Sequence, residues 1–180
     1  MPPQPASHAY YRAKHGVWRG ELRLVVTDAA ALRVVSPRLF DRLRARATAA
    51  LFNAVGSLRL DATLDYQTSG AQGRVVHTTR VSWRGIPLLR GVEQITLHPD
   101  GVTATMDRRE WALPWPIPDV DRGARVVVAP AGDAAAYDLT WFGAPLRQIT
   151  HTVDIDRLRL VQLTSWSRAE VVLERHPRTC

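Results

Sequence analysis

The sequence predicts a mainly β protein, an antiparallel up-and-down barrel of about ten strands with one helix inserted after the first strand. Segments of alternating apolar and polar residues recur at a spacing of roughly 8–12 residues, which is typical of sandwiches and barrels. One segment has clear helical periodicity, and no series of alternating strands and helices indicates a parallel sheet. The 180 residues suit one core. We expect residues 1–14 to form a disordered tail and residues 15–180 a single β-barrel domain.

The first strand and the helix come early in this predicted domain. Residues 16–26 alternate apolar with charged side chains, which indicates a strand with one buried face. Ser36 supplies an N-cap hydroxyl, Pro37 suits the first helical position, and Gly56 is a natural helix stop. We therefore expect a helix near residues 37–55.

This predicted helix has two different faces. The apolar residues repeat at helical spacing on one of them: Leu39, Phe40, Leu43, Ala47, Ala50, Leu51 and Ala54. Arg38, Arg42 and Arg46 are spaced by four and fall on the opposite face. These arginines are either an ordinary solvated surface or a docking site for an acidic carrier protein.

The remainder of the chain alternates as a meander of strands separated by turns. Asp100-Gly101 is a hairpin signal, and the proline-rich loop at residues 113–118 excludes a central strand there. The chain then continues as short alternating segments and ends in a strand over residues 168–176 rather than in a long helix.

The composition excludes several classes of function. The net charge is +7, but the basic residues are scattered, and all except Lys14 are arginine. Without a recognisable nucleic-acid motif, we predict no nucleic-acid partner. The positive charge is concentrated in residues 1–90, which have a net charge of +9, against −2 for residues 91–180. Such an asymmetry can steer an acidic partner to one side.

The sequence was searched for membrane-spanning segments, signal peptides and cofactor-binding motifs, and none was found. No apolar run reaches the ~20 residues that span a bilayer, and the start of the chain has no signal-like apolar stretch. We therefore expect a cytoplasmic protein without a membrane span. No metal-ligand spacing, phosphate-binding loop or hydrolase motif occurs, so we predict no cofactor and no metal site. Cys180 is the single cysteine and cannot form an internal disulfide.

The opening strand, with its Gly-Val-Trp-Arg-Gly start at residues 16–20, resembles the glycine–tryptophan strand of the calycins, the lipocalins and fatty-acid-binding proteins. One strand, a helical segment and a long meander also resemble that group across the domain. The resemblance implies a barrel with a pocket for a hydrophobic small molecule. The helix-grip fold of polyketide cyclases and lipid-transfer domains is the competing interpretation.

Alternate residues of a barrel strand point inward, so the more apolar parity of each strand predicts the lining of a pocket. Following that parity gives a set of candidate ligand-binding side chains: Tyr66, Trp83, Met106, Tyr137, Trp141, Gln148, Gln162 and Trp166. A few polar groups in an apolar wall are typical of ligand sites, but the same pattern fits a filled barrel core.

His77 and Glu93 are the candidate catalytic residues. Each shares its parity with apolar neighbours, and the two lie on successive predicted strands, so they can meet inside the barrel. A buried histidine and carboxylate suit acid/base chemistry, although such a histidine is often only hydrogen-bonded. His151 shares parity with apolar neighbours too and is a further candidate.

Three functions remain open at this point. The favoured one is binding of a hydrophobic small molecule, such as a lipid or polyketide-like intermediate, in a barrel pocket. An enzyme of the cyclase or isomerase kind would fold such a substrate in the same pocket and act on it with one or two polar groups. A structural barrel with a filled core is the third.

Overall fold

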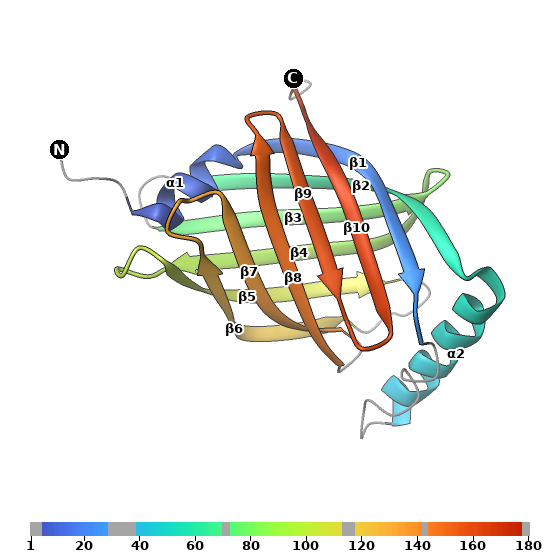
Figure 1. Cartoon of the computed structure of the whole chain (residues 1–180). Coiled ribbons are helices and arrows are strands. Elements are labelled where there is room, and N and C mark those ends of the chain that lie inside the picture. Colours follow the sequence, from blue (N-terminus) through green and yellow to red (C-terminus); the bar gives the residue numbers. More distant parts are fainter. Residues whose placement is uncertain (1–4, 29–38, 70–72, 113–117, 142–143, 178–180) are drawn as a thin grey trace.

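The computed structural model of the chain describes residues 5–28, 39–69, 73–112, 118–141 and 144–177. Each strand in it pairs antiparallel with the next one along the chain, and the last pairs with the first to close a barrel (Figure 1). The strands within the described residues are β1 (Gly16–Val26), β2 (Ser57–Ser69), β3 (Arg74–Trp83), β4 (Ile86–Leu97), β5 (Thr103–Ala112), β6 (Asp119–Val128), β7 (Ala134–Trp141), β8 (Ala144–Asp154), β9 (Arg157–Leu163) and β10 (Ser167–His176). The predicted ten-strand antiparallel barrel is confirmed, and the helix-grip alternative is wrong.

Barrel closure follows from the alternation of the sequence. Along β10, buried and more exposed residues alternate from Ser167 to Leu173, and β5 shows the same period from Ala104 to Glu110. One face of every strand can therefore turn inward, and closure gives each strand a neighbour on both sides.

The prediction of a disordered tail at residues 1–14 is wrong for its second half. Residues Ala6–Ala13 form helix α1, which lies at one end of the barrel (Figure 1). Ser7 N–H donates to the Gly101 carbonyl, and the Arg175 guanidinium donates to the carbonyls of Ala13 and His15. These long-range contacts cannot be read from local composition. Residues 1–4 lie outside the described part of the chain.

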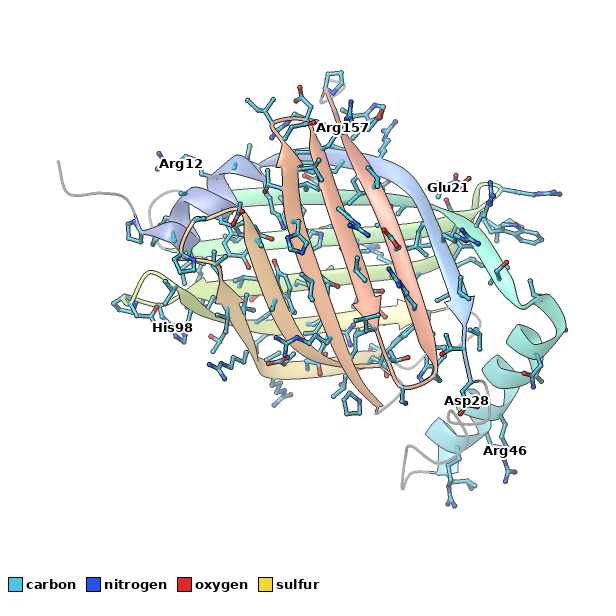
Figure 2. The ribbon with its side chains drawn as sticks, in the orientation of Figure 1. Arg12, Glu21, Asp28, Arg46, His98 and Arg157 are labelled. Carbon is cyan, nitrogen blue, oxygen red and sulfur yellow. The ribbon has the colours of Figure 1, made fainter. Side chains whose placement is uncertain are left out.

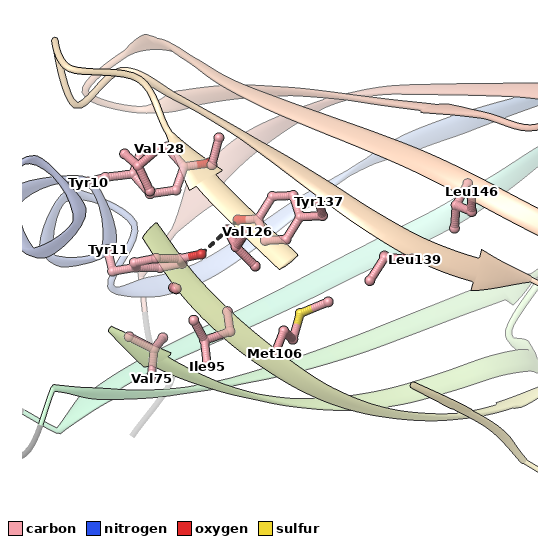
Figure 3. Close-up of a cluster of buried hydrophobic side chains, with 12 residues drawn as sticks. Tyr10, Tyr11, Val75, Ile95, Met106, Val126, Val128, Tyr137, Leu139 and Leu146 are labelled. Carbon is pink, nitrogen blue, oxygen red and sulfur yellow. Dashed lines mark hydrogen bonds between the residues drawn. The ribbon is translucent and has the colours of Figure 1, made fainter. Parts of the chain in front are cut away.

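Helix α1 closes its end of the barrel with two tyrosines. Tyr10 and Tyr11 are buried, and Figure 3 shows them among the aliphatic side chains of the strands. The hydroxyl of Tyr11 donates to that of Tyr137 at 3.2 Å, so a polar contact joins α1 to β7 inside the cluster. Burial raises the pKa of both α1 tyrosines well above 10.0, and each phenol stays protonated.

Helix α2 (Leu39–Val55) lies at the opposite end of the barrel, where the sequence predicts a helix (Figure 1). Its predicted apolar face is not packed as expected: Leu39 is 68% exposed and Leu43 is 48% exposed. Arg42 is exposed, and so is Arg46, which points away from the barrel (Figure 2). Arg38 lies outside the described residues. Within the described residues, neither helix has the length and apolar character needed to cross a membrane.

The barrel wall has one weakly paired junction, between β6 and β7. Within the described residues these strands share only the partner pairs from Val126↔Tyr137 to Val128↔Ala135, at one end of β6. Beyond them, side chains replace the backbone ladder. The backbone N–H of Thr140 in β7 donates to Asp121 in β6 at 3.1 Å, and Arg108 in β5 donates to the Thr140 carbonyl. We call Arg108, Glu110, Asp121 and Thr140 the Arg108 network.

Candidate functional site

The half of the barrel nearer α2 contains a cavity of about 350 Å³. Most of its wall is aliphatic and comes from both ends of the chain, with Leu22 and Leu24 of β1, Leu60 and Leu64 of β2, and Leu160 of β9. Polar side chains also line it: His77, Thr79, Glu93, Arg108, Glu110, Gln148 and Gln162. The volume lies within the range of small-molecule sites, and the mixture of a large apolar wall with a few polar groups is typical of them.

His77 and Glu93 meet inside this cavity, as their positions in the sequence predict. They are register partners on β3 and β4, and His77 Nδ1 lies 2.5 Å from Glu93 Oε2. Both side chains are buried. Because a carboxylate can only accept, Nδ1 of His77 carries the proton, and Nε2 lies 3.4 Å from the hydroxyl of Thr79. The ring is also stacked on Tyr66 of β2, with the ring centroids 3.9 Å apart.

The charge of Glu93 is maintained by its neighbours. Burial raises the pKa of Glu93, but the attraction and hydrogen bond of His77, followed by the positive charges of Arg108 and Lys14, outweigh it, and the pKa is lowered. Lys14 is the chain's single lysine and is 0% exposed. Burial lowers its pKa well below 10.5, Glu93 opposes that shift, and its amine donates to Tyr10 Oη.

The sequence reasoning missed two charged residues of the cavity wall, Arg108 and Glu110. Arg108 donates from Nη1 to Glu110 Oε2 at 3.2 Å and from Nε to Asp121 Oδ2 at 2.8 Å. Burial lowers the pKa of Arg108, but the two carboxylates more than compensate and raise it. A signal was present, since both residues continue the inward parity of Ala104 and Met106 along β5.

The predicted ligand-binding residues divide into two groups. Trp141, Gln148 and Gln162 line the cavity, and the Gln162 amide donates to Gln148 Oε1 at 2.8 Å. The other buried ones lie in the packed interior and do not line it: Tyr66, Met106, Tyr137 and Trp166. Trp166 is buried beside the wall, where its ring stacks on Trp141 with the centroids 5.1 Å apart.

Two predictions of inward-facing residues are wrong. Trp83 is the last residue of β3, and its side chain is 44% exposed. Its ring contacts the guanidinium of Arg84 instead. His151 is exposed on β8, so it does not belong to the cavity.

The arrangement can hold an apolar molecule and offer it acid/base groups at one end. We call His77, Glu93, Arg108 and Glu110 the polar end of the cavity. The part of the chain that the structure describes holds no group of three or more His, Cys, Asp or Glu side chains suited to a metal ion.

Comparisons with known proteins bear on the fold alone. No protein-family model and no curated protein matches the chain. Among solved structures, the chain is similar to Rv2717c from M. tuberculosis, with 12% identity, a TM-score of 0.61 and coverage of 96% of this chain and 98% of that one. It is also similar to the S-type phycobiliprotein lyase CPES from Guillardia theta, with 8% identity, a TM-score of 0.56 and coverage of 98% and 100%.

A third similar structure is a protein of unknown function from the DUF3598 family of Nostoc punctiforme, with 15% identity and a TM-score of 0.55. The match covers 92% of this chain and 49% of that protein, so the chain spans about half of its length. These likenesses agree with the closed ten-strand topology. The chain has a calycin-like β-barrel fold, as its opening strand and meander predict.

Proposed function

We propose that the protein binds a hydrophobic small molecule in the cavity of the α2 half of the barrel. The observation that carries the proposal is the cavity of about 350 Å³, with its aliphatic wall and a polar end at one side. Burying apolar surface of a ligand there contributes about 25 cal/mol per Å². The filled-barrel alternative fits the α1 end, where tyrosines and aliphatic side chains of the described residues form a buried cluster.

The neutral fluorophore N-phenyl-1-naphthylamine tests this function, because its emission rises when it leaves water. We expect saturable uptake by the native protein. Leu160→Trp, which adds bulk to the cavity wall, should weaken uptake at least tenfold because the ligand volume is filled.

The matched control is Val172→Trp, since Val172 is 49% exposed on the outer face of β10. It adds an indole to the same barrel without entering the cavity, and uptake should be unchanged. No uptake by the native protein, or equal uptake by Leu160→Trp and Val172→Trp, would refute the proposed binding.

The alternative of a cyclase or isomerase is favoured by one observation, the 2.5 Å contact between His77 and Glu93. Glu93 accepts the Nδ1 hydrogen bond and orients the ring, which leaves Nε2 to act as a general base inside an apolar cavity. This geometry suits abstraction of a proton next to a carbonyl group.

Exchange of the α-protons of 2-decanone in deuterated water, followed by NMR, measures that chemistry directly. We expect the native protein to accelerate exchange and His77→Gln to reduce the acceleration by ~10²-fold. His151→Gln is the control, because His151 is exposed. Exchange that is absent, or unaffected by His77→Gln, rules out this alternative and leaves binding untouched.

Association with an acidic carrier protein stays a prediction. Its support is that Arg42 and Arg46 are exposed on α2, at the cavity end of the barrel. A partner bound there would be in place to deliver or receive a ligand, and rim charges of this kind act mainly on the association rate.

A further inference from the structure

The polar end of the cavity is rich in negative charge. Glu93 and Glu110 line the cavity, and Asp121 lies directly behind them, bound to Arg108. Within the described residues, the cations nearby are Arg108, Lys14 and, when protonated, His77. When all three are positively charged, they balance the three negative charges of Glu93, Glu110 and Asp121. When His77 or Lys14 is neutral, the net charge of these six groups is negative.

Each of these cations already has partners in the protein. Arg108 donates to Asp121, Glu110 and the Thr140 carbonyl, so its charge is shared between two carboxylates. His77 donates to Glu93.

Lys14 donates to Tyr10 Oη and does not itself line the cavity. An incoming anion would therefore have to compete with the carboxylates that hold these groups.

We infer that the ligand is an apolar molecule ending in an amine, or in another hydrogen-bond donor, and that the cavity discriminates against a carboxylate end. A buried charge without a partner is costly, and a third carboxylate beside Glu93 and Glu110 would have no cation of its own. An ammonium group or a hydroxyl placed there meets acceptors instead. The difference in binding free energy between a donor end and a carboxylate end lets the cavity distinguish ligands that have the same apolar chain.

This inference rests on the proposed binding function and adds the chemical class of the ligand. The test uses three molecules that share a ten-carbon chain: decylamine, 1-decanol and decanoate. Each is titrated, below the concentration at which it forms micelles, against the protein loaded with N-phenyl-1-naphthylamine at neutral pH. We expect decylamine to displace the fluorophore at a concentration at least tenfold lower than decanoate, with 1-decanol between them.

Two variants test whether the preference for decylamine over decanoate comes from the carboxylate of Glu110. Glu110→Gln keeps the shape of the side chain and removes one negative charge, so it should reduce the ratio of decylamine to decanoate affinity at least tenfold. The affinity for 1-decanol should change little. Glu174→Gln removes a carboxylate from an exposed position on β10 and should leave the ratio unchanged.

The outcomes separate the two proposals. If the fluorophore is not taken up, the binding function itself fails. If it is taken up but decanoate displaces it as well as decylamine does, binding stands and the inferred ligand class is wrong. Should Glu110→Gln unfold, the comparison of the three molecules on the native protein still decides the question.

Discussion

Replacing Arg108 with leucine should lower the free energy of unfolding by about 3–5 kcal/mol, because the change leaves two buried carboxylates without their cation. Glu110 and Asp121 are both buried, and Arg108 contacts them at 3.2 and 2.8 Å. The same change removes a donor from the Thr140 carbonyl, where the β6–β7 backbone ladder is missing. Urea denaturation followed by tryptophan emission measures the loss.

Two further variants show whether buried charge is the cause. Arg109→Leu alters the next residue of β5, which is exposed, and should stay within about half a kcal/mol of the native protein. Combining Arg108→Leu with Glu110→Leu and Asp121→Leu removes the uncompensated carboxylates and should recover part of the stability. If Arg108→Leu lowers the free energy of unfolding no more than Arg109→Leu does, the Arg108 network does not stabilise the barrel.

Gly20→Ala should destabilise the protein by about 3 kcal/mol or more, which is at the upper end of the free-energy cost of overpacking a protein interior. Gly20 lies in β1, which bends along its length as it passes β10 (Figure 1). A Cβ at this position would overlap the backbone carbonyl oxygen of Val172, which cannot move without disturbing the β1–β10 pairing. Thermal and urea denaturation should both report a less stable barrel.

Gly91→Ala is the matched control for that change. Gly91 is a buried strand glycine, whereas Gly20 is half-buried. A Cβ at Gly91 would meet the Thr79 and Glu110 side chains at ordinary contact distances of 3.5 Å and more. We expect its effect to be much smaller than that of Gly20→Ala. Similar losses for the two variants would mean that the cost comes from adding a methyl group to any strand glycine rather than from the clash with β10.

Local pattern explains why much of the fold could be predicted from the sequence. The period of two along the strands indicates their inward faces, and successive strands of a meander pair with each other. Those two rules were enough to bring His77 and Glu93 together, because each is on the inward parity of its strand and the strands are neighbours.

The features that could not be predicted depend on tertiary structure. Helix α1 has only eight residues, and it is stabilised by contacts with residues more than a hundred positions away, such as Tyr137 and Thr150. Trp83 has the inward parity of β3, but it is the last residue of the strand and its side chain is 44% exposed. Arg108 and Glu110 have the inward parity of β5, but charged residues are rarely buried unless they are paired, and their pairing is visible only in the structure.

Closure of the barrel by the pairing of β1 with β10 has a consequence for how the chain folds. Val17 is the register partner of His176, so residues near the two ends of the sequence must meet before the sheet is complete. During synthesis, β1 leaves the ribosome before β10, and one edge of β1 stays unpaired until β10 has been made. Contacts of such large sequence separation slow folding, since the entropy of closing the long loop is lost before the contact forms. We therefore expect slow refolding, on a timescale of milliseconds to seconds, with β1 open to pairing with other chains in the meantime.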